Sequence, residues 1–230
     1  MKKYQKLMLL LCLGCLGSTV QSQNLTVGAS LNPGISKVSS DRTNDDNWAT
    51  NYTWSGNVGL FLERKVGRSS ALGIEALWVQ LEGKDVSKQE ELRFSSQNGT
   101  PPEVVGVAYS TNKFHSSYLG LPIYYRYQWG KIGIKAGAQP LLFLFANTRF
   151  QSTGEVRGEP FDVDNRTTGI RFERIDLGPK VGLDYALGQK FRLRADYYHG
   201  LTDIIIGELG SKRKNRQLNL GLSYLFGRQG

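Results

Sequence analysis

A histidine and a serine two residues apart form the pair in this sequence whose types and spacing could support catalysis. The chain has two histidines, and one of them stands in His115-Ser116-Ser117. A histidine can act as general base toward a serine nucleophile when an acidic residue orients its imidazole. Alternate residues of a strand share a face, so His115 and Ser117 are able to meet. The segment that follows, 118–130, supplies no acidic residue, and we interpret His115 as a residue at the end of a loop.

Two other groups of polar residues are of types that can bind metal ions. Asp41, Asp45 and Asp46 stand close together, but a calcium loop also needs a central glycine and a closing glutamate, which this segment lacks. His199 precedes Gly200 and has no clear partner in the sequence. We therefore predict no metal, no cofactor and no catalytic residue, and we expect the protein not to be an enzyme.

The N-terminus has the organisation of a secretory signal peptide. A lysine-rich stretch at residues 2–6 precedes an apolar stretch from Leu7 to Leu16, which is too short to cross a bilayer as a helix. Val20 and Ser22 then place modest side chains at the third and first positions before a cleavage site. We predict that residues 1–22 are removed during export.

Charge and cysteine content narrow the class of partner. Both cysteines, Cys12 and Cys15, lie in the signal peptide, so the exported chain has no disulfide and no thiol chemistry. The chain has 29 basic and 20 acidic residues, and loss of the three signal-peptide lysines leaves a net charge of +6. An exported protein meets no nucleic acid, so this excess, including Lys212, Arg213 and Lys214, suits anionic lipid or sugar at a membrane surface.

The rest of the chain is dominated by alternation of polar and apolar residues. No stretch after residue 22 approaches the roughly 20 apolar residues that a membrane helix requires. A period of two, typical of strands, recurs instead. The alternating segments are 25–35, 52–64, 71–81, 118–129, 131–145, 175–185, 191–201 and 217–226.

The connections between these segments alternate in length. Short turns, VGRSS, WGK and LGQK, join the second segment to the third, the fourth to the fifth and the sixth to the seventh. Long polar connections occupy 37–51, 83–115, 146–169 and 203–215. This pattern predicts an all-β fold in residues 23–230, an eight-stranded antiparallel transmembrane β-barrel with short periplasmic turns and long outer loops.

The two faces of the strands predict where lipid and water lie. One face is aliphatic and ends in aromatic residues, as the lipid-facing side of a membrane barrel does. The other face carries charges of both signs, which must pair inside a barrel only wide enough for side chains. A soluble barrel with the faces reversed is the alternative. The predicted interior charges are Glu75, Arg126, Lys135, Asp176, Lys180, Asp184, Arg192, Arg194 and Asp196.

Several motifs together resemble a known family. SYLGLPIYYRY, IGIKAGAQPLLF, DLGPKVGLDY, LRADYYHGLTDI and NRQLNLGLSYLF are similar in order and spacing to the PorT-like outer-membrane β-barrel proteins of the Bacteroidetes type. The resemblance covers about residues 24–227 and is strongest after 116. It implies an eight-stranded barrel in the outer membrane of a Gram-negative bacterium. Some members of that family take part in secretion or gliding machinery.

The final strand resembles the C-terminal signal that the barrel-assembly machinery reads. Asn219, Gly221, Tyr224 and Phe226 fall on the polar, glycine and two aromatic positions of that signal. The sequence departs from it in the tail, 227–230, because the last aromatic residue often ends the chain. We predict that this strand directs insertion by the assembly machinery and closes the barrel.

Function is expected to rest on the outer loops. We predict a non-enzymatic outer-membrane protein with a side-chain-filled lumen that binds outer-membrane lipid and, through loops 83–115 and 146–169, an envelope or secretion partner. One alternative is a lipid-modifying hydrolase, because the His-x-Ser spacing resembles the catalytic pair of outer-membrane lipid A deacylases. The other is a small diffusion channel.

Overall fold

The computed structural model describes residues 25–40, 48–87, 90–94, 103–167, 173–204 and 212–228. The predicted signal peptide and the aspartates Asp41, Asp45 and Asp46 lie outside these residues. None of the described residues forms a helix able to cross a membrane. The described strands are β1 (Leu25–Ser40), β2 (Trp48–Asn51), β3 (Thr53–Lys65), β4 (Ser70–Ser87), β5 (Glu90–Phe94), β6 (Glu103–Gly120), β7 (Ile123–Trp129), β8 (Ile132–Val156), β9 (Glu159–Thr167), β10 (Ile175–Leu187), β11 (Phe191–His199) and β12 (Arg213–Arg228).

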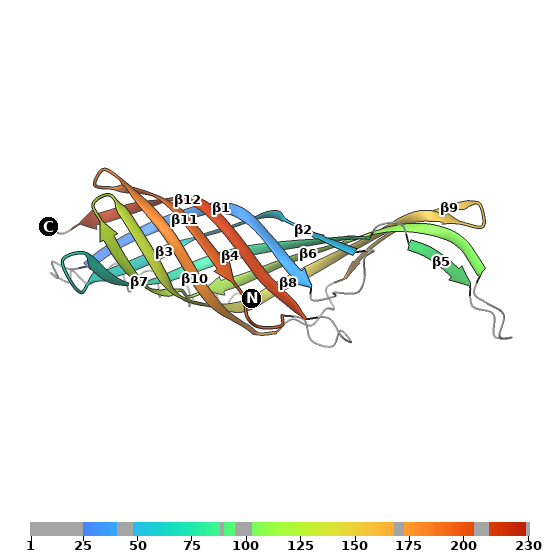
Figure 1. Ribbon diagram of the computed structural model, residues 1–230, viewed down its shortest axis with the longest axis horizontal. Helices are drawn as coiled ribbons and strands as arrows, with labels where there is room; N and C mark the ends of the chain where they lie inside the picture. Colours follow the sequence, from blue (N-terminus) through green and yellow to red (C-terminus); the bar gives the residue numbers. More distant parts are fainter. Residues whose placement is uncertain are drawn as a thin grey trace, which may run out of the picture.

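Eight strand positions close into an antiparallel ring (Figure 1). The positions around the ring are β1, then β3, β4, the pair β6 and β7, β8, β10, β11 and finally β12. β12 pairs back with β1, from Thr26↔Arg228 to Ser40↔Arg213, and so closes the ring. β6 and β7 occupy one position in the ring because both lie between β4 and β8. Pro122 separates them, since proline has no N–H to give to a ladder. The ring confirms the predicted eight-stranded barrel.

The short turns close one end of the barrel. The turns between β7 and β8 and between β10 and β11 contain Gly130 and Gly188, with φ angles of 58° and 77°. Glycine adopts such positive φ angles without steric cost, so the turns between these strands can be tight. By the usual arrangement of outer-membrane barrels, this end faces the periplasm.

At the opposite end, several strands continue far beyond the ring and form a projecting sheet of β5, β6, β8 and β9 (Figure 1). Much of the predicted loops 83–115 and 146–169 is therefore strand. β4 runs to Ser87, and β8 runs to Val156 before a turn at Arg157 and Gly158, whose φ angles are 51° and 83°. Outside the membrane both faces of a strand meet water, so no apolar alternation marks it in the sequence.

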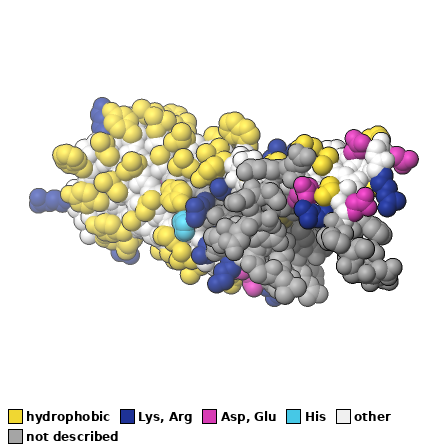
Figure 2. All heavy atoms as spheres, turned by 45° about the vertical axis from the view of Figure 1, so that its right-hand side comes forward, with side chains coloured by type: hydrophobic (Ala, Val, Ile, Leu, Met, Phe, Trp, Pro, Cys, Tyr) yellow, Lys and Arg dark blue, Asp and Glu magenta, His cyan; other side chains and the backbone are white. Residues whose placement is uncertain are grey.

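The outward face of the ring carries the apolar side chains, as the alternation predicts. Leu31, Leu60, Ile134, Leu183 and Leu220 are all exposed. Figure 2 shows hydrophobic side chains gathered over the barrel, with charged side chains more frequent over the projecting part. This arrangement is that of a membrane barrel, and it excludes the soluble alternative, which needs the apolar face inside.

The interior contains an apolar layer that the sequence did not predict. Leu77, Val79 and Leu81 of β4 point inward and pack with side chains from β6, β8 and β11. β4 has apolar residues on both faces in this region, with Trp78 on the outside, so its period-two pattern is weak. The buried cluster comprises Leu77, Val79, Leu81, Tyr118, Leu141 and Tyr198.

Candidate functional site

A network of ion pairs crosses the interior of the barrel at the level of Glu75. The carboxylate of Glu75 lies 2.6 Å from Arg194 Nη2 and 3.3 Å from Lys180 Nζ. Asp196 forms ion pairs with Arg194 at 3.1 Å and with Lys135 at 2.9 Å. All five side chains are buried. Because β4 and β11 lie on opposite sides of the ring, the Glu75–Arg194 pair spans the lumen.

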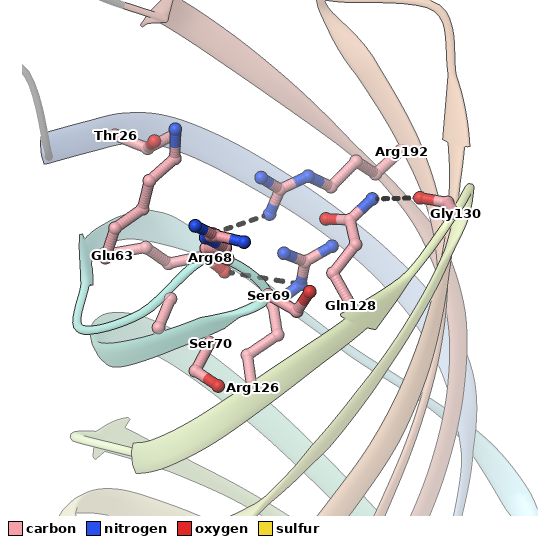
Figure 3. Close-up of a pocket in the computed structure, with 11 residues that line it drawn as sticks. Thr26, Glu63, Arg68, Ser69, Ser70, Arg126, Gln128, Gly130 and Arg192 are labelled. Atoms are coloured by element: carbon pink, nitrogen blue, oxygen red, sulfur yellow. Dashed lines mark hydrogen bonds and ion pairs between the residues drawn. The ribbon is translucent and has the colours of Figure 1, made fainter.

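A second layer of charges lies closer to the periplasmic end. Arg126 binds Asp184 through two hydrogen bonds of 2.6 and 2.8 Å. Arg192 Nη1 lies 2.8 Å from Glu63, which also accepts from the Tyr124 hydroxyl at 3.0 Å. Figure 3 shows Arg126 and Arg192 directed toward Glu63. Glu63, Arg126 and Arg192 line a cavity of about 200 Å³ at the periplasmic end.

The structure brings most of the predicted interior charges together. Eight of the nine join ion pairs, and Asp176 lies apart, where it accepts a hydrogen bond of 2.8 Å from Asn215 Nδ2. Glu63 belongs to the network although the sequence did not single it out. The sequence pattern could have identified Glu63, because it follows the lipid-facing Leu62 and so belongs to the inward phase of the alternation.

The outer end of the interior holds a further buried ion pair. Arg213 Nη1 lies 2.5 Å from Asp85, and the Arg213 guanidinium sits 4.6 Å from the ring centre of Phe114. Phe114 also packs with Val38 and Ile204. The basic run 212–214, predicted to meet lipid or solvent, is therefore divided, because Arg213 turns inward while Lys212 is exposed. Charged and apolar layers alternate along the barrel axis and fill the interior.

The possible catalytic pair has a different geometry from the one the sequence suggested. His115 Nδ1 lies 2.9 Å from Glu82 Oε1 of β4, so the acidic partner comes from a neighbouring strand and not from 118–130. Ser117 is 0 % exposed, and its hydroxyl has no hydrogen-bond partner among the described residues. A nucleophile must reach its substrate, and Ser117 is closed off. The His115, Glu82 and Ser117 side chains therefore do not form a catalytic triad with an accessible nucleophile.

The closing strand places the four residues of the predicted assembly signal on two faces. Tyr224 and Phe226 point outward with ring centres 5.7 Å apart, and Phe191 of β11 lies 5.2 Å from Tyr224. Asn219 is buried, and Gly221 lies where any side chain would meet the β1 backbone. The outward aromatic residues form part of a girdle near the short turns.

Comparisons with known proteins agree on the fold. Residues 21–205 match the family described as outer membrane protein beta-barrel domain. No curated protein matches the chain significantly. Likeness to solved structures is distant and does not indicate a shared function.

One is the crystal structure of Ail, the attachment invasion locus protein of Yersinia pestis, in complex with the heparin analogue sucrose octasulfate, with 12 % identity over 88 % of this chain and 99 % of that one and a TM-score of 0.39. Neisserial surface protein A has 11 % identity over 86 % and 96 %, with a TM-score of 0.40. The outer membrane protease OmpT from Escherichia coli has 8 % identity over 88 % and 95 %, with a TM-score of 0.39.

The family match spans most of the chain and agrees with the closed ring and its apolar outer face. The protein therefore lies in the outer membrane, and it belongs to the outer membrane protein β-barrel domain family.

Proposed function

We propose that the protein is a non-enzymatic, non-conducting outer-membrane barrel that presents its projecting sheet to a protein partner in the cell envelope. The observation that carries this proposal is the long pairing of β6 with β8, which runs from Gly120↔Leu141 in the barrel to Gly106↔Val156 with one register shift between Ser117 and Tyr118. The seven residue steps from Lys113 to Gly106 alone extend the sheet by about 23 Å. A barrel that served only to span the membrane has no use for such an extension.

The exposed apolar side chains of the projecting sheet support a protein partner. Phe150 and Val163 lie on one face, because Ser152, two residues after Phe150, pairs with Val163. Both are exposed outside the apolar band of the barrel. Exposed apolar groups away from lipid commonly mark binding surfaces. The resemblance to PorT-like proteins favours a partner in a secretion or envelope assembly.

The filled interior supports the absence of conduction. Buried ion pairs between opposite strands, such as Glu75 with Arg194, place side chains across the lumen, where they should obstruct the passage of water and ions. The buried hydroxyl of Ser117 argues against the hydrolase alternative. We therefore expect planar bilayers that contain the purified protein to show no discrete conductance steps. Native membranes should keep the same lipid profile when His115→Ala replaces the wild-type protein.

Site-specific photo-crosslinking in cells tests the proposed partner. A photoreactive residue at Val163 should yield a discrete crosslinked protein band. The same residue at Leu187, similarly exposed but at the periplasmic end of the barrel, should not yield that band. Equal crosslinking at both positions, or no band at Val163, contradicts the proposed partner, and discrete conductance steps contradict the proposed non-conducting barrel.

A further inference from the structure

The outer surface of the barrel carries a notch where the ladder between β3 and β4 is interrupted. β4 pairs with β3 as far as Gln80 and pairs with β2 again from Lys84. Between these points the Ser36 hydroxyl of β1 accepts from the Glu82 N–H at 2.9 Å and donates to the Glu82 carbonyl at 2.7 Å. The backbone at the break is thus satisfied, so the notch is a stable feature of the fold.

The notch has the size and lining of a site for a polar ligand with an apolar part. Its volume is about 620 Å³, within the usual range of small-molecule sites. One wall is aromatic, with Tyr52 and the 77 % exposed Trp54. The other side carries Lys84, Lys113 and Arg149. The Glu82–His115 pair also lines it.

The three basic residues form a lateral row across neighbouring strands. Lys84 of β4 is directly opposite Lys113 of β6, and Lys113 is directly opposite Arg149 of β8. Like charges in directly opposed positions destabilise a sheet. Arg149 is compensated by Asp164, at 2.9 Å, but in the described part of the chain neither lysine has an ion-pair partner. An anion between them would relieve this repulsion.

The row stands just beyond the apolar band of the barrel. On β3 the outward residues Leu62, Leu60 and Val58 are followed by Trp54. The rings of Trp78 on β4 and Phe145 on β8 lie 6.0 Å apart. Farther along these strands, toward the outer end, follow the charged residues Glu82, Lys84 and Arg149. Aromatic residues mark the interface between hydrocarbon and headgroups in membrane barrels. Figure 2 likewise shows Lys and Arg side chains at the end of the hydrophobic region. The notch therefore opens at headgroup level on the outer side.

We propose that this notch binds the phosphorylated headgroup of a glycolipid of the outer leaflet. Lys84 and Lys113 hold the phosphate, and Trp54 packs against the sugar ring. A lipid source fits the position, because the ligand's acyl chains would continue along the exposed Val58 and Leu60. This binding is independent of the proposed protein partner, which uses the projecting sheet.

Lipid titration of the purified full chain in phosphatidylcholine nanodiscs tests the proposal by native mass spectrometry. Bisphosphorylated lipid A should bind, and its affinity should fall about 30-fold in the Lys84→Gln, Lys113→Gln double variant, since each lysine near an anionic group contributes roughly fivefold. The matched control is Lys65→Gln, Lys131→Gln, which removes two exposed lysines at the periplasmic end. This control should bind lipid A as the wild type does.

Two further probes separate the possible sources of the phosphate. Lipid A without phosphates should bind the wild type as weakly as bisphosphorylated lipid A binds the double variant, and inorganic phosphate should not compete at equal concentration. The proposal is overturned if both double variants lose affinity equally or if neither does. Equal binding of the dephosphorylated lipid, or equal competition by inorganic phosphate, overturns it as well. Heat-modifiable gel mobility verifies that each variant is folded.

Discussion

The carboxylate of Glu75 on β4 lies 2.6 Å from the guanidinium of Arg194 on β11, directly across the inside of the barrel. Three strand positions lie between β4 and β11 in either direction around the ring. The interior must therefore be narrow enough for two side chains to meet, as expected for eight strands. This pair therefore links opposite walls of the barrel.

Replacement of Glu75 by alanine should strongly destabilise the barrel. The change leaves Arg194 and Lys180 buried without this carboxylate, and breaking a buried ion pair typically costs about 3–5 kcal/mol. Urea titration in detergent micelles, followed by heat-modifiable gel mobility, measures the free energy of unfolding. Glu159→Ala, which changes an exposed glutamate of the projecting sheet, should have almost no effect. Equal stability of both variants would show that Glu75 does not stabilise the barrel.

A charge on the outward face should destabilise the protein only where that face meets hydrocarbon. Leu220 is 65 % exposed and lies within the apolar run of β12, so Leu220→Arg should cost about 2–4 kcal/mol in lipid vesicles. Val163→Arg, at an exposed position of the projecting sheet, should cost far less because its site meets water. The measurement is reversible unfolding by tryptophan fluorescence. If Val163→Arg lowered the free energy of unfolding more than Leu220→Arg does, the assignment of the membrane-spanning region would be wrong.

Phe226 should matter for assembly in cells more than for the stability of the finished barrel. Phe226→Ala removes the last aromatic residue of the predicted assembly signal, whereas Phe191→Ala removes a neighbouring girdle residue outside it. Pulse-chase labelling with heat-modifiability as readout should show slower folding for Phe226→Ala than for Phe191→Ala. Refolding into detergent should not distinguish them. If the two variants assemble at the same rate in cells, Phe226 contributes to the aromatic girdle and not to the assembly signal.

The Arg149–Asp164 pair predicts a pH dependence of the projecting sheet. Hydrogen bonds from the Arg149 side chain hold the pKa of Asp164 below its ordinary value of 3.8. A lowered folded-state pKa means that the pair stabilises the β8–β9 hairpin above the unfolded pKa, and that this contribution is lost as pH falls through the folded pKa. Carboxyl NMR titration should give a midpoint below 3.8, and Arg149→Gln should raise it. Identical midpoints would contradict the pairing.

The sequence determined the membrane-spanning part of this protein because lipid imposes a strict alternation. Every strand that crosses hydrocarbon must turn one apolar face outward, and the three short turns leave little room for another register. The number of strands, the neighbours that the short turns join and the outward position of Leu31 or Leu220 therefore follow from the alternation and the turns alone. Most interior charges could be identified as well, since they occupy the opposite phase of the same alternation.

Only the tertiary structure decided which of these charges meet and how the outer end is organised. Glu75 and Arg194 are 119 residues apart, and no local pattern specifies their contact, which depends on closure of the ring. Glu82 reaches His115 from another strand, Ser117 is closed off by its neighbours, and Lys84 aligns with Lys113 through strand register. Beyond the membrane, water on both faces removes the alternation that marks a strand. Pairing of backbone groups, and not side-chain pattern, extends β6 and β8 there.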